Sequence, residues 1–84
     1  MKEIFVVDDE RILRVSLADD LRDAGYKVLE FAEPRSALAE LQKRDVSVVI
    51  TDLKMPQMDG IELLRRIKET KPEVTVVIMT SYAT

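Results

Sequence analysis

The chain of 84 residues contains no cysteine and no histidine. Without cysteine it forms no disulfide and offers no thiolate to a metal ion. Without histidine it has no imidazole zinc ligand and no Ser-His or Cys-His catalytic pair. These two absences exclude imidazole-based zinc sites and the hydrolases that depend on an activated serine or cysteine.

Long apolar runs and an excess of basic charge are also missing. No apolar run approaches the roughly 20 residues that span a bilayer, and the start, MKEIFVVDDE, has an apolar stretch too short for a signal peptide. The net charge is −3 and the basic residues form no strong cluster, so we expect no nucleic-acid binding by these residues. A composition of 46% hydrophobic and 35% charged residues predicts one soluble globular domain, and we expect it in the cytoplasm.

Four short apolar runs alternate with three segments of helical periodicity. The first helical segment, residues 10–24, carries Leu13, Leu17 and Leu21 at helical spacing; the second begins near Pro34, and the third covers residues 59–70. The predicted strands are residues 3–8, 26–31, 46–50 and 74–79. Strands separated by helices predict an α/β fold with parallel strands and right-handed crossovers. The near-continuous apolar strands indicate a sheet covered on both faces, as in a doubly wound fold.

Acidic and hydroxyl side chains follow three of these strands. Asp8 and Asp9 follow the first, Asp52 the third, and Thr80 and Ser81 the fourth. Because the carboxyl ends of parallel strands share one edge, these side chains converge in one shallow pocket if the first and third strands are neighbours. Clustered carboxylates repel one another, and a divalent cation, best Mg²⁺, resolves the repulsion. The pattern predicts phosphoryl transfer, in which Asp52 attacks phosphorus and Thr80 or Ser81 binds a phosphoryl oxygen.

Each acid taken alone has a simpler explanation. Asp8 or Asp9 is positioned to cap the first helix, and Asp59 to cap the third. Asp52 is harder to explain in this way, because no helix begins directly after it. Only the joint pattern at one sheet edge favours a metal site over ordinary capping and solvation.

The loop LKMPQMDG follows the third strand. Pro56 restricts its backbone, and we expect Gly60 to permit a tight turn into the third helix. Met55 and Met58 are expected to fill space in the core, and the side chain of Lys54 is expected to be solvated. The loop is therefore predicted to be a stiff support for the acid that precedes it.

The stretches VVDDE, ITDLKMPQMDGIELL and VVIMTSYA together resemble the receiver domain of two-component response regulators, and are most similar to receivers of the nitrogen-regulator type. The resemblance covers the whole chain. It implies a flavodoxin-like (CheY-like) doubly wound parallel sheet with strand order 2-1-3-4-5.

The resemblance also implies a role for each acid. Asp52 matches the phosphoacceptor; Asp8 and Asp9 match the pair that holds Mg²⁺ together with Asp52 and the backbone carbonyl of Lys54. Thr80 matches a switch hydroxyl that moves toward the phosphoryl group. The implied donor is a phosphohistidine on a sensor histidine kinase, and a chain without histidine is consistent with an acceptor.

The family pattern continues with a fourth helix, a fifth strand ending in a phosphoryl-contacting Lys, and a fifth helix. The lysines of this chain lie elsewhere, at positions 2, 27, 43, 54, 68 and 71. We therefore expect residues 1–84 to form a truncated receiver domain, impaired in phosphorylation. Residues 74–79 would then form an open sheet edge that pairs with a second copy, giving a homo-oligomer.

Two other functions are alternatives to that of a phosphoacceptor. One is a receiver-derived fragment that folds by self-association and has no phosphoswitch activity. The other is a Mg²⁺-dependent phosphatase with an Asp nucleophile, as in haloacid-dehalogenase-like proteins. Those enzymes need a D-x-D motif, whereas Asp52 is followed by Leu53 and Lys54. We therefore do not expect a free-standing enzyme.

Overall fold

A computed structural model describes residues 2–80, in which four parallel strands alternate with three helices. The strands lie side by side in the order β2-β1-β3-β4. This confirms the α/β class and the strand order expected of a flavodoxin-like sheet for these four strands. None of the helices in the described part is long and apolar enough to cross a membrane. The elements are β1 (Glu3–Val7), α1 (Arg11–Asp23), β2 (Lys27–Phe31), α2 (Pro34–Leu41), β3 (Val46–Asp52), α3 (Gly60–Thr70) and β4 (Thr75–Met79).

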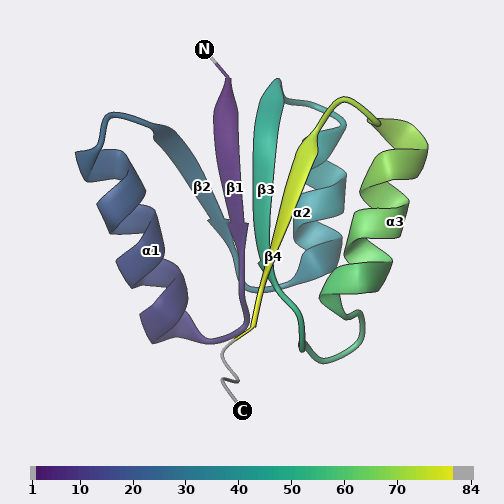
Figure 1. Ribbon diagram of the computed structural model, residues 1–84, viewed down its shortest axis with the longest axis horizontal. Helices are drawn as coiled ribbons and strands as arrows, with labels where there is room; N and C mark the ends of the chain where they lie inside the picture. Colours follow the sequence, from purple (N-terminus) through teal and green to yellow (C-terminus); the bar gives the residue numbers. More distant parts are fainter. Residues whose placement is uncertain (1, 81–84) are drawn as a thin grey trace.

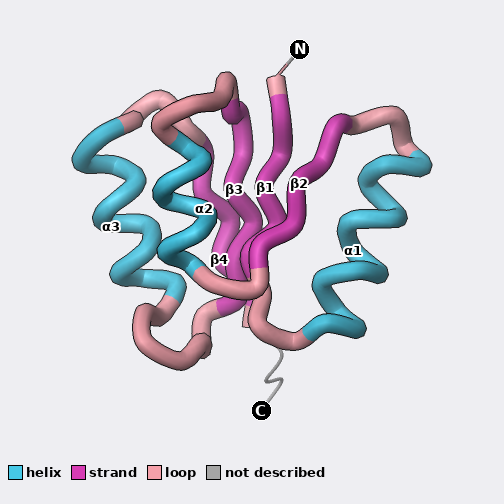
Figure 2. Tube along the Cα trace, turned by 180° about the vertical axis from the view of Figure 1, so that it is seen from behind, coloured by secondary structure: helices cyan, strands magenta, loops and turns pink. Residues whose placement is uncertain are grey.

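Helix α1 covers one face of the sheet, and α2 and α3 cover the other (Figures 1 and 2). Successive side chains of β1 point to opposite faces of the sheet and so meet different helices. Phe5 and Val7 pack toward α2 and α3 in the larger core cluster, while Ile4 and Val6 pack with Ala18 of α1 in the smaller one. Because both faces of β1 are covered, all of its residues are buried, as its continuous apolar run predicts.

The face that carries α1 is less completely covered than the other. Val48 and Ile50 of β3 are only half-buried on this face, and Val77 of β4, which pairs with Ile50, is 44% exposed. Leu13, the first apolar residue of the predicted α1 stripe, is also 44% exposed. The apolar surface between α1 and β4 is therefore open to solvent in this structure.

Local signals in the sequence account for the helix ends. Gly25 has a φ of 99°, and the amides of Gly25 and Tyr26 donate to the carbonyls of Arg22 and Leu21, which is the hydrogen-bond pattern of a glycine-terminated helix. Pro34 is the first residue of α2. Asp59 caps α3, since its carboxylate accepts a hydrogen bond from the Glu62 amide at 2.8 Å. The capping explanation was thus correct for Asp59.

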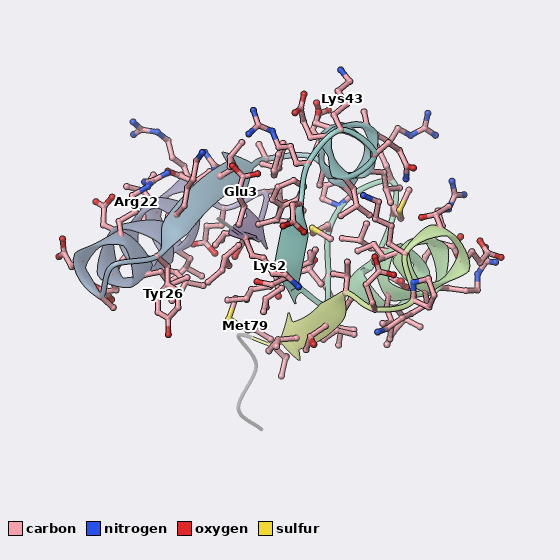
Figure 3. The ribbon with its side chains drawn as sticks, turned by 90° about the horizontal axis from the view of Figure 1, so that it is seen from above. Lys2, Glu3, Arg22, Tyr26, Lys43 and Met79 are labelled. Atoms are coloured by element: carbon pink, nitrogen blue, oxygen red, sulfur yellow. The ribbon has the colours of Figure 1, made fainter. Side chains whose placement is uncertain are left out.

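A buried acid anchors the amino end of the sheet. Glu3 is 4% exposed, and its carboxylate contacts Arg44 at 3.0 Å and Lys27 at 3.3 Å. Figure 3, seen from this end, shows Glu3 at the start of β1. A buried carboxylate is tolerated only when its charge is compensated, and these two cations tie β1 to β2 and to the loop after α2.

Gly60 lies where the loop after β3 returns to the sheet. A Cβ at this position would stand 2.5 Å from the carbonyl oxygen of Asp52 and 3.2 Å from Cα of Leu53. Gly60 is not among the residues with positive φ, so it permits the predicted tight turn into α3 by lacking a Cβ and not by a left-handed backbone conformation. Its role is to let the start of α3 approach the backbone of Asp52.

Gly60→Ala should lower the free energy of unfolding by about 2 kcal/mol because the added methyl group overpacks against the Asp52 carbonyl. Alanine in a helix is otherwise favoured over glycine by about 1 kcal/mol, so a gain in stability would contradict this account. Urea unfolding measures the change. Gly25→Ala is the control: nothing lies within 4 Å of its added Cβ, so that variant loses stability only through its backbone conformation.

Candidate functional site

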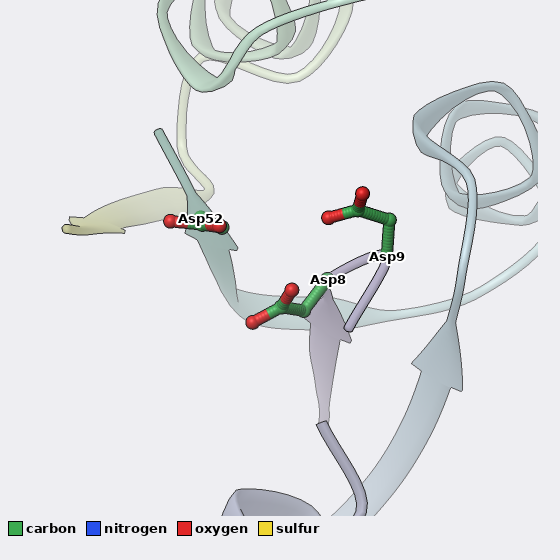
Figure 4. A group of neighbouring side chains, drawn as sticks. All are labelled: Asp8, Asp9 and Asp52. Carbon is green, nitrogen blue, oxygen red and sulfur yellow. The ribbon is translucent and has the colours of Figure 1, made fainter. Parts of the chain in front are cut away.

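Three carboxylates meet at the carboxyl ends of β1 and β3. Asp8 and Asp9 directly follow β1, and Asp52 is the last residue of β3. One carboxylate oxygen of each lies within 4.8 Å of the other two (Figure 4). Asp8 is buried, Asp52 is half-buried and Asp9 is exposed. The predicted convergence of the three acids at one sheet edge is therefore observed.

Two neighbouring depressions adjoin the three acids. Asp8, Asp52 and Thr80 line a pocket of about 330 Å³, whose apolar wall includes Leu13 and Met79. Asp9 instead lines a smaller depression of about 150 Å³ beside the loop after β3. The three acids therefore line two adjoining depressions, while one carboxylate oxygen of each stays within 4.8 Å of the other two. Ser81 lies outside the described residues.

Asp52 is held by hydrogen bonds from both of its neighbours in the chain. Its Oδ1 accepts a hydrogen bond from the Leu53 amide at 2.8 Å. Its carbonyl oxygen accepts one from the hydroxyl of Thr51 at 3.0 Å, and that hydroxyl lies 3.8 Å from the sulfur of Met55. Thr51 is completely buried and was not singled out in the sequence, because a threonine within a β-branched run looks like an ordinary strand residue.

The loop after Asp52 is anchored in the core by its methionines. Met55 and Met58 are buried in the larger core cluster, as their expected packing role requires. Between them the Met58 amide donates to the Pro56 carbonyl at 2.8 Å, and Gln57 has a φ of 73°, which together form a γ-turn. The side chain of Lys54 is exposed. The loop is therefore a stiff support for Asp52.

Asp8 is fixed by three hydrogen bonds, which are made by its amide, its carboxylate and its carbonyl. Its amide donates to the Phe31 carbonyl at 3.0 Å, its Oδ1 accepts from the Glu10 amide at 2.9 Å, and its carbonyl accepts from Nη1 of Arg14 at 2.9 Å. The N-cap of α1 is Glu10, which makes no side-chain capping bond. The alternative that Asp8 or Asp9 is the helix cap was therefore wrong, although the Asp8 carboxylate does bind the Glu10 amide.

Burial raises the pKa of the Asp8 carboxyl above its ordinary value of 3.8. The Glu10 amide opposes this shift, and the negative charges of Asp52, Asp9 and Glu10 add to it. The site is therefore short of positive charge. Oxygen donors that repel one another in this way fit a hard divalent cation, which would favour the ionised carboxylates.

Comparison with known proteins identifies this arrangement. The model of the response regulator receiver domain family matches residues 4–84. The chain belongs to this family. The predicted resemblance to receiver domains is thus confirmed over nearly its whole length.

Individual relatives agree with that assignment. The chain is 40% identical over 83 residues to the response regulator receiver protein CpdR of Brucella abortus, covering 99% of this chain and 69% of the relative. It is 36% identical to the DNA-binding transcriptional regulator NtrC of Salmonella typhimurium, covering 95% of this chain but only 17% of NtrC. The predicted similarity to nitrogen-regulator receivers is confirmed by the match to NtrC. The match to CpdR shows that the chain is also similar to other receivers.

A solved receiver supports the fold independently. The response regulator TrrA of Thermotoga maritima, determined in complex with Mg²⁺ and beryllium fluoride, superimposes with a TM-score of 0.91 at 31% identity. The match covers 99% of this chain and 72% of that chain. The four-stranded sheet and its three helices are therefore arranged as in a known receiver.

The raised pKa of Asp8 predicts a pH dependence of stability in the absence of divalent cations. The folded protein binds this proton more readily than the unfolded chain, so the free energy of unfolding falls as pH rises through the folded pKa. We expect Asp8→Asn to need more urea to unfold than the wild type at neutral pH in EDTA. The difference should vanish below the ordinary pKa of 3.8, where the wild-type carboxyl is protonated in both states. A wild type that is the more stable protein at neutral pH in EDTA would contradict this.

Proposed function

We propose that this chain is the phosphoacceptor module of a two-component response regulator, in which Asp52 receives a phosphoryl group from a phosphohistidine of a sensor kinase in the cytoplasm. The observation that carries the proposal is the meeting of Asp8, Asp9 and Asp52 within 4.8 Å in a chain of the receiver family. The module acts on the kinase's phosphohistidine, and we do not propose a free-standing enzyme.

Mg²⁺ is the proposed cofactor. The three carboxylates and the backbone carbonyl of Lys54 would hold it, and a small cation that keeps some of its waters suits a site with few protein ligands. When bound, it supplies positive charge that neutralises phosphoryl oxygens during transfer. Burial, and after it the negative charges of Asp52, Asp9 and Glu10, raise the pKa of Asp8, and the meeting of three carboxylates is the feature of this structure that supports a cation here.

The chemistry of the chain's own residues follows from how Asp52 is held. Its Oδ1 accepts a hydrogen bond from the Leu53 amide, which also donates to the Met79 carbonyl, and Oδ2 is the proposed nucleophile. Oδ2 forms a P–O bond to phosphorus while the P–N bond of the donor phosphohistidine breaks, and the departing imidazole takes up a proton from solvent. The products are an aspartyl phosphate and a neutral histidine. Thr80, which lines the same pocket, is proposed to bind a phosphoryl oxygen, as is Ser81.

Incubation with Mg²⁺ and acetyl phosphate should add one phosphate to the chain, detected by intact-mass spectrometry. The adduct should be lost in Asp52→Asn and in EDTA. Asp59→Asn is the matched control, since Asp59 is an exposed acid on the same loop that only caps α3, and it should keep the adduct. An adduct that persists in Asp52→Asn would overturn the assignment of the phosphoacceptor.

A second candidate function is self-association without a phosphoswitch. Strand β4 pairs with β3 on one side only, and within residues 2–80 nothing pairs with its other edge. An open edge with exposed apolar side chains such as Val77 is a template for another strand. We propose that residues 74–79 pair with the same residues of a second copy about a two-fold axis.

Sedimentation velocity tests this association. The wild type should dimerise as its concentration rises, and Val77→Lys should raise the dissociation constant at least about 10-fold because a charged edge opposes pairing. Ile61→Lys is the control: Ile61 is also an exposed apolar residue, at 55%, but it belongs to α3 and not to β4, so dimerisation of this variant should be unchanged. A wild type that stays monomeric at every concentration would rule the second candidate out.

A further inference from the structure

Arg14 of α1 is placed between the acidic site and β2. Its Nη1 donates to the carbonyl oxygen of Asp8 at 2.9 Å, and its Nε lies 3.4 Å from Oε1 of Glu30. The side chain is 14% exposed. The Nε–H is buried and, among the described residues, has no hydrogen-bond partner, so the contact with Glu30 is ionic only. A buried N–H without a hydrogen-bond partner costs free energy, and Arg14 keeps this position through its contacts with Asp8 and Glu30.

Glu30 is itself held in place from the other side. Its Oε2 accepts a hydrogen bond from Nη1 of Arg22 at 3.1 Å, and Nη2 of Arg22 donates to the Val28 carbonyl at 3.0 Å. The chain of contacts therefore runs from β2 through Glu30 to Arg14, and from Arg14 to the backbone of Asp8. Arg14 is attached to a rigid strand at one end and to the loop after β1 at the other.

The contact with the Asp8 carbonyl fixes a whole peptide plane. The Asp8 carbonyl and the Asp9 amide belong to the same planar peptide unit. The preceding peptide is fixed by the bond from the Asp8 amide to the Phe31 carbonyl. Together the two planes set the direction of the Cα–Cβ bond of Asp8, and the Asp8–Asp9 peptide is one of the two peptides that flank the Cα of Asp9. Asp9 itself is exposed.

We propose that Arg14 is a positioning residue, which orients the Asp8–Asp9 peptide so that both carboxylates face the metal site. It acts through the backbone, because its hydrogen bond to Asp8 is made to the carbonyl oxygen and not to the carboxylate. The inference rests on the proposed Mg²⁺ site. Outer partners of metal ligands commonly contribute to affinity in this indirect way.

The test compares Arg14→Met with Arg22→Met. Both variants remove an arginine of α1 that contacts Glu30, but only Arg14 touches Asp8. Mg²⁺ affinity is measured by calorimetric titration, and stability without metal by urea unfolding. We expect Arg14→Met to raise the Mg²⁺ dissociation constant about 10-fold and Arg22→Met to change it less than about 2-fold, although both lose stability. An equal effect of the two variants, or none, would overturn the proposal.

A metal-free measurement separates this inference from the Mg²⁺ site itself. The Glu10 amide donates to Oδ1 of Asp8, so its hydrogen exchange reports the order of the acid loop. We expect exchange at Glu10 to be about 10-fold faster in Arg14→Met, while the Lys71 amide, bonded to the Ile67 carbonyl at the far end of α3, stays unchanged. If wild type binds no Mg²⁺, the proposed function fails; unchanged exchange at Glu10 means that the positioning role fails.

A conservative variant covers the case in which Arg14→Met does not fold. Arg14→Lys keeps the positive charge but lacks the fork that reaches Asp8 and Glu30 together. We expect it to weaken Mg²⁺ binding about 3-fold, because a single ammonium group replaces the two-point contact. A folded Arg14→Lys protein with wild-type Mg²⁺ affinity and wild-type exchange at Glu10 would overturn the proposal.

Discussion

Asp8, Asp9 and Asp52 each bring a carboxylate oxygen within 4.8 Å of the other two, and like charges at such a distance repel unless a cation lies between them. Hydrogen bonds from neighbouring residues keep Asp8 and Asp52 in place. The Leu53 amide and the Thr51 hydroxyl hold Asp52, and the Glu10 amide holds the carboxylate of Asp8. The repulsion is thus retained in the folded state, where it contributes to the raised pKa of Asp8. This repulsion is what the proposed cation would relieve.

The rest of the fold supplies the rigidity that this arrangement needs. Strand β1 is buried on both faces between two core clusters, so the position at which Asp8 leaves the sheet is well determined. Met55 and Met58 anchor the loop after β3 in the larger cluster, and Gly60 allows α3 to begin against the carbonyl of Asp52. The conformational freedom of both acid-bearing loops is therefore limited by hydrophobic packing, which acts at a distance from the acids themselves.

The incompletely covered face of the sheet adjoins the same site. Leu13 and Met79 line one pocket with Asp8, Asp52 and Thr80, and Val77 on β4 is exposed. Under the two proposals for this chain, phosphoryl transfer uses the polar end of this pocket and self-association uses the edge of β4. The two surfaces meet at Met79 and Thr80. A second copy bound along β4 would therefore lie next to the acidic site.

The sequence by itself determined the succession of strands and helices, because hydrophobic periodicity is a local property. It also determined the parallel sheet and the placement of the three acids after β1 and β3, because those acids follow directly on the strands and parallel strands end at the same edge. It also identified Asp59 as a cap and the two methionines as core residues. Only the tertiary structure decided the role of Gly60, the separation of Asp9 into its own depression and the contact of Arg14 with Asp8. Each of these depends on distances between segments remote in sequence or on the direction of a peptide plane, and neither quantity leaves a periodic signal in the chain. Leu13 shows the same limit: its spacing predicts the face of α1 correctly, but whether that face is covered depends on what packs against it.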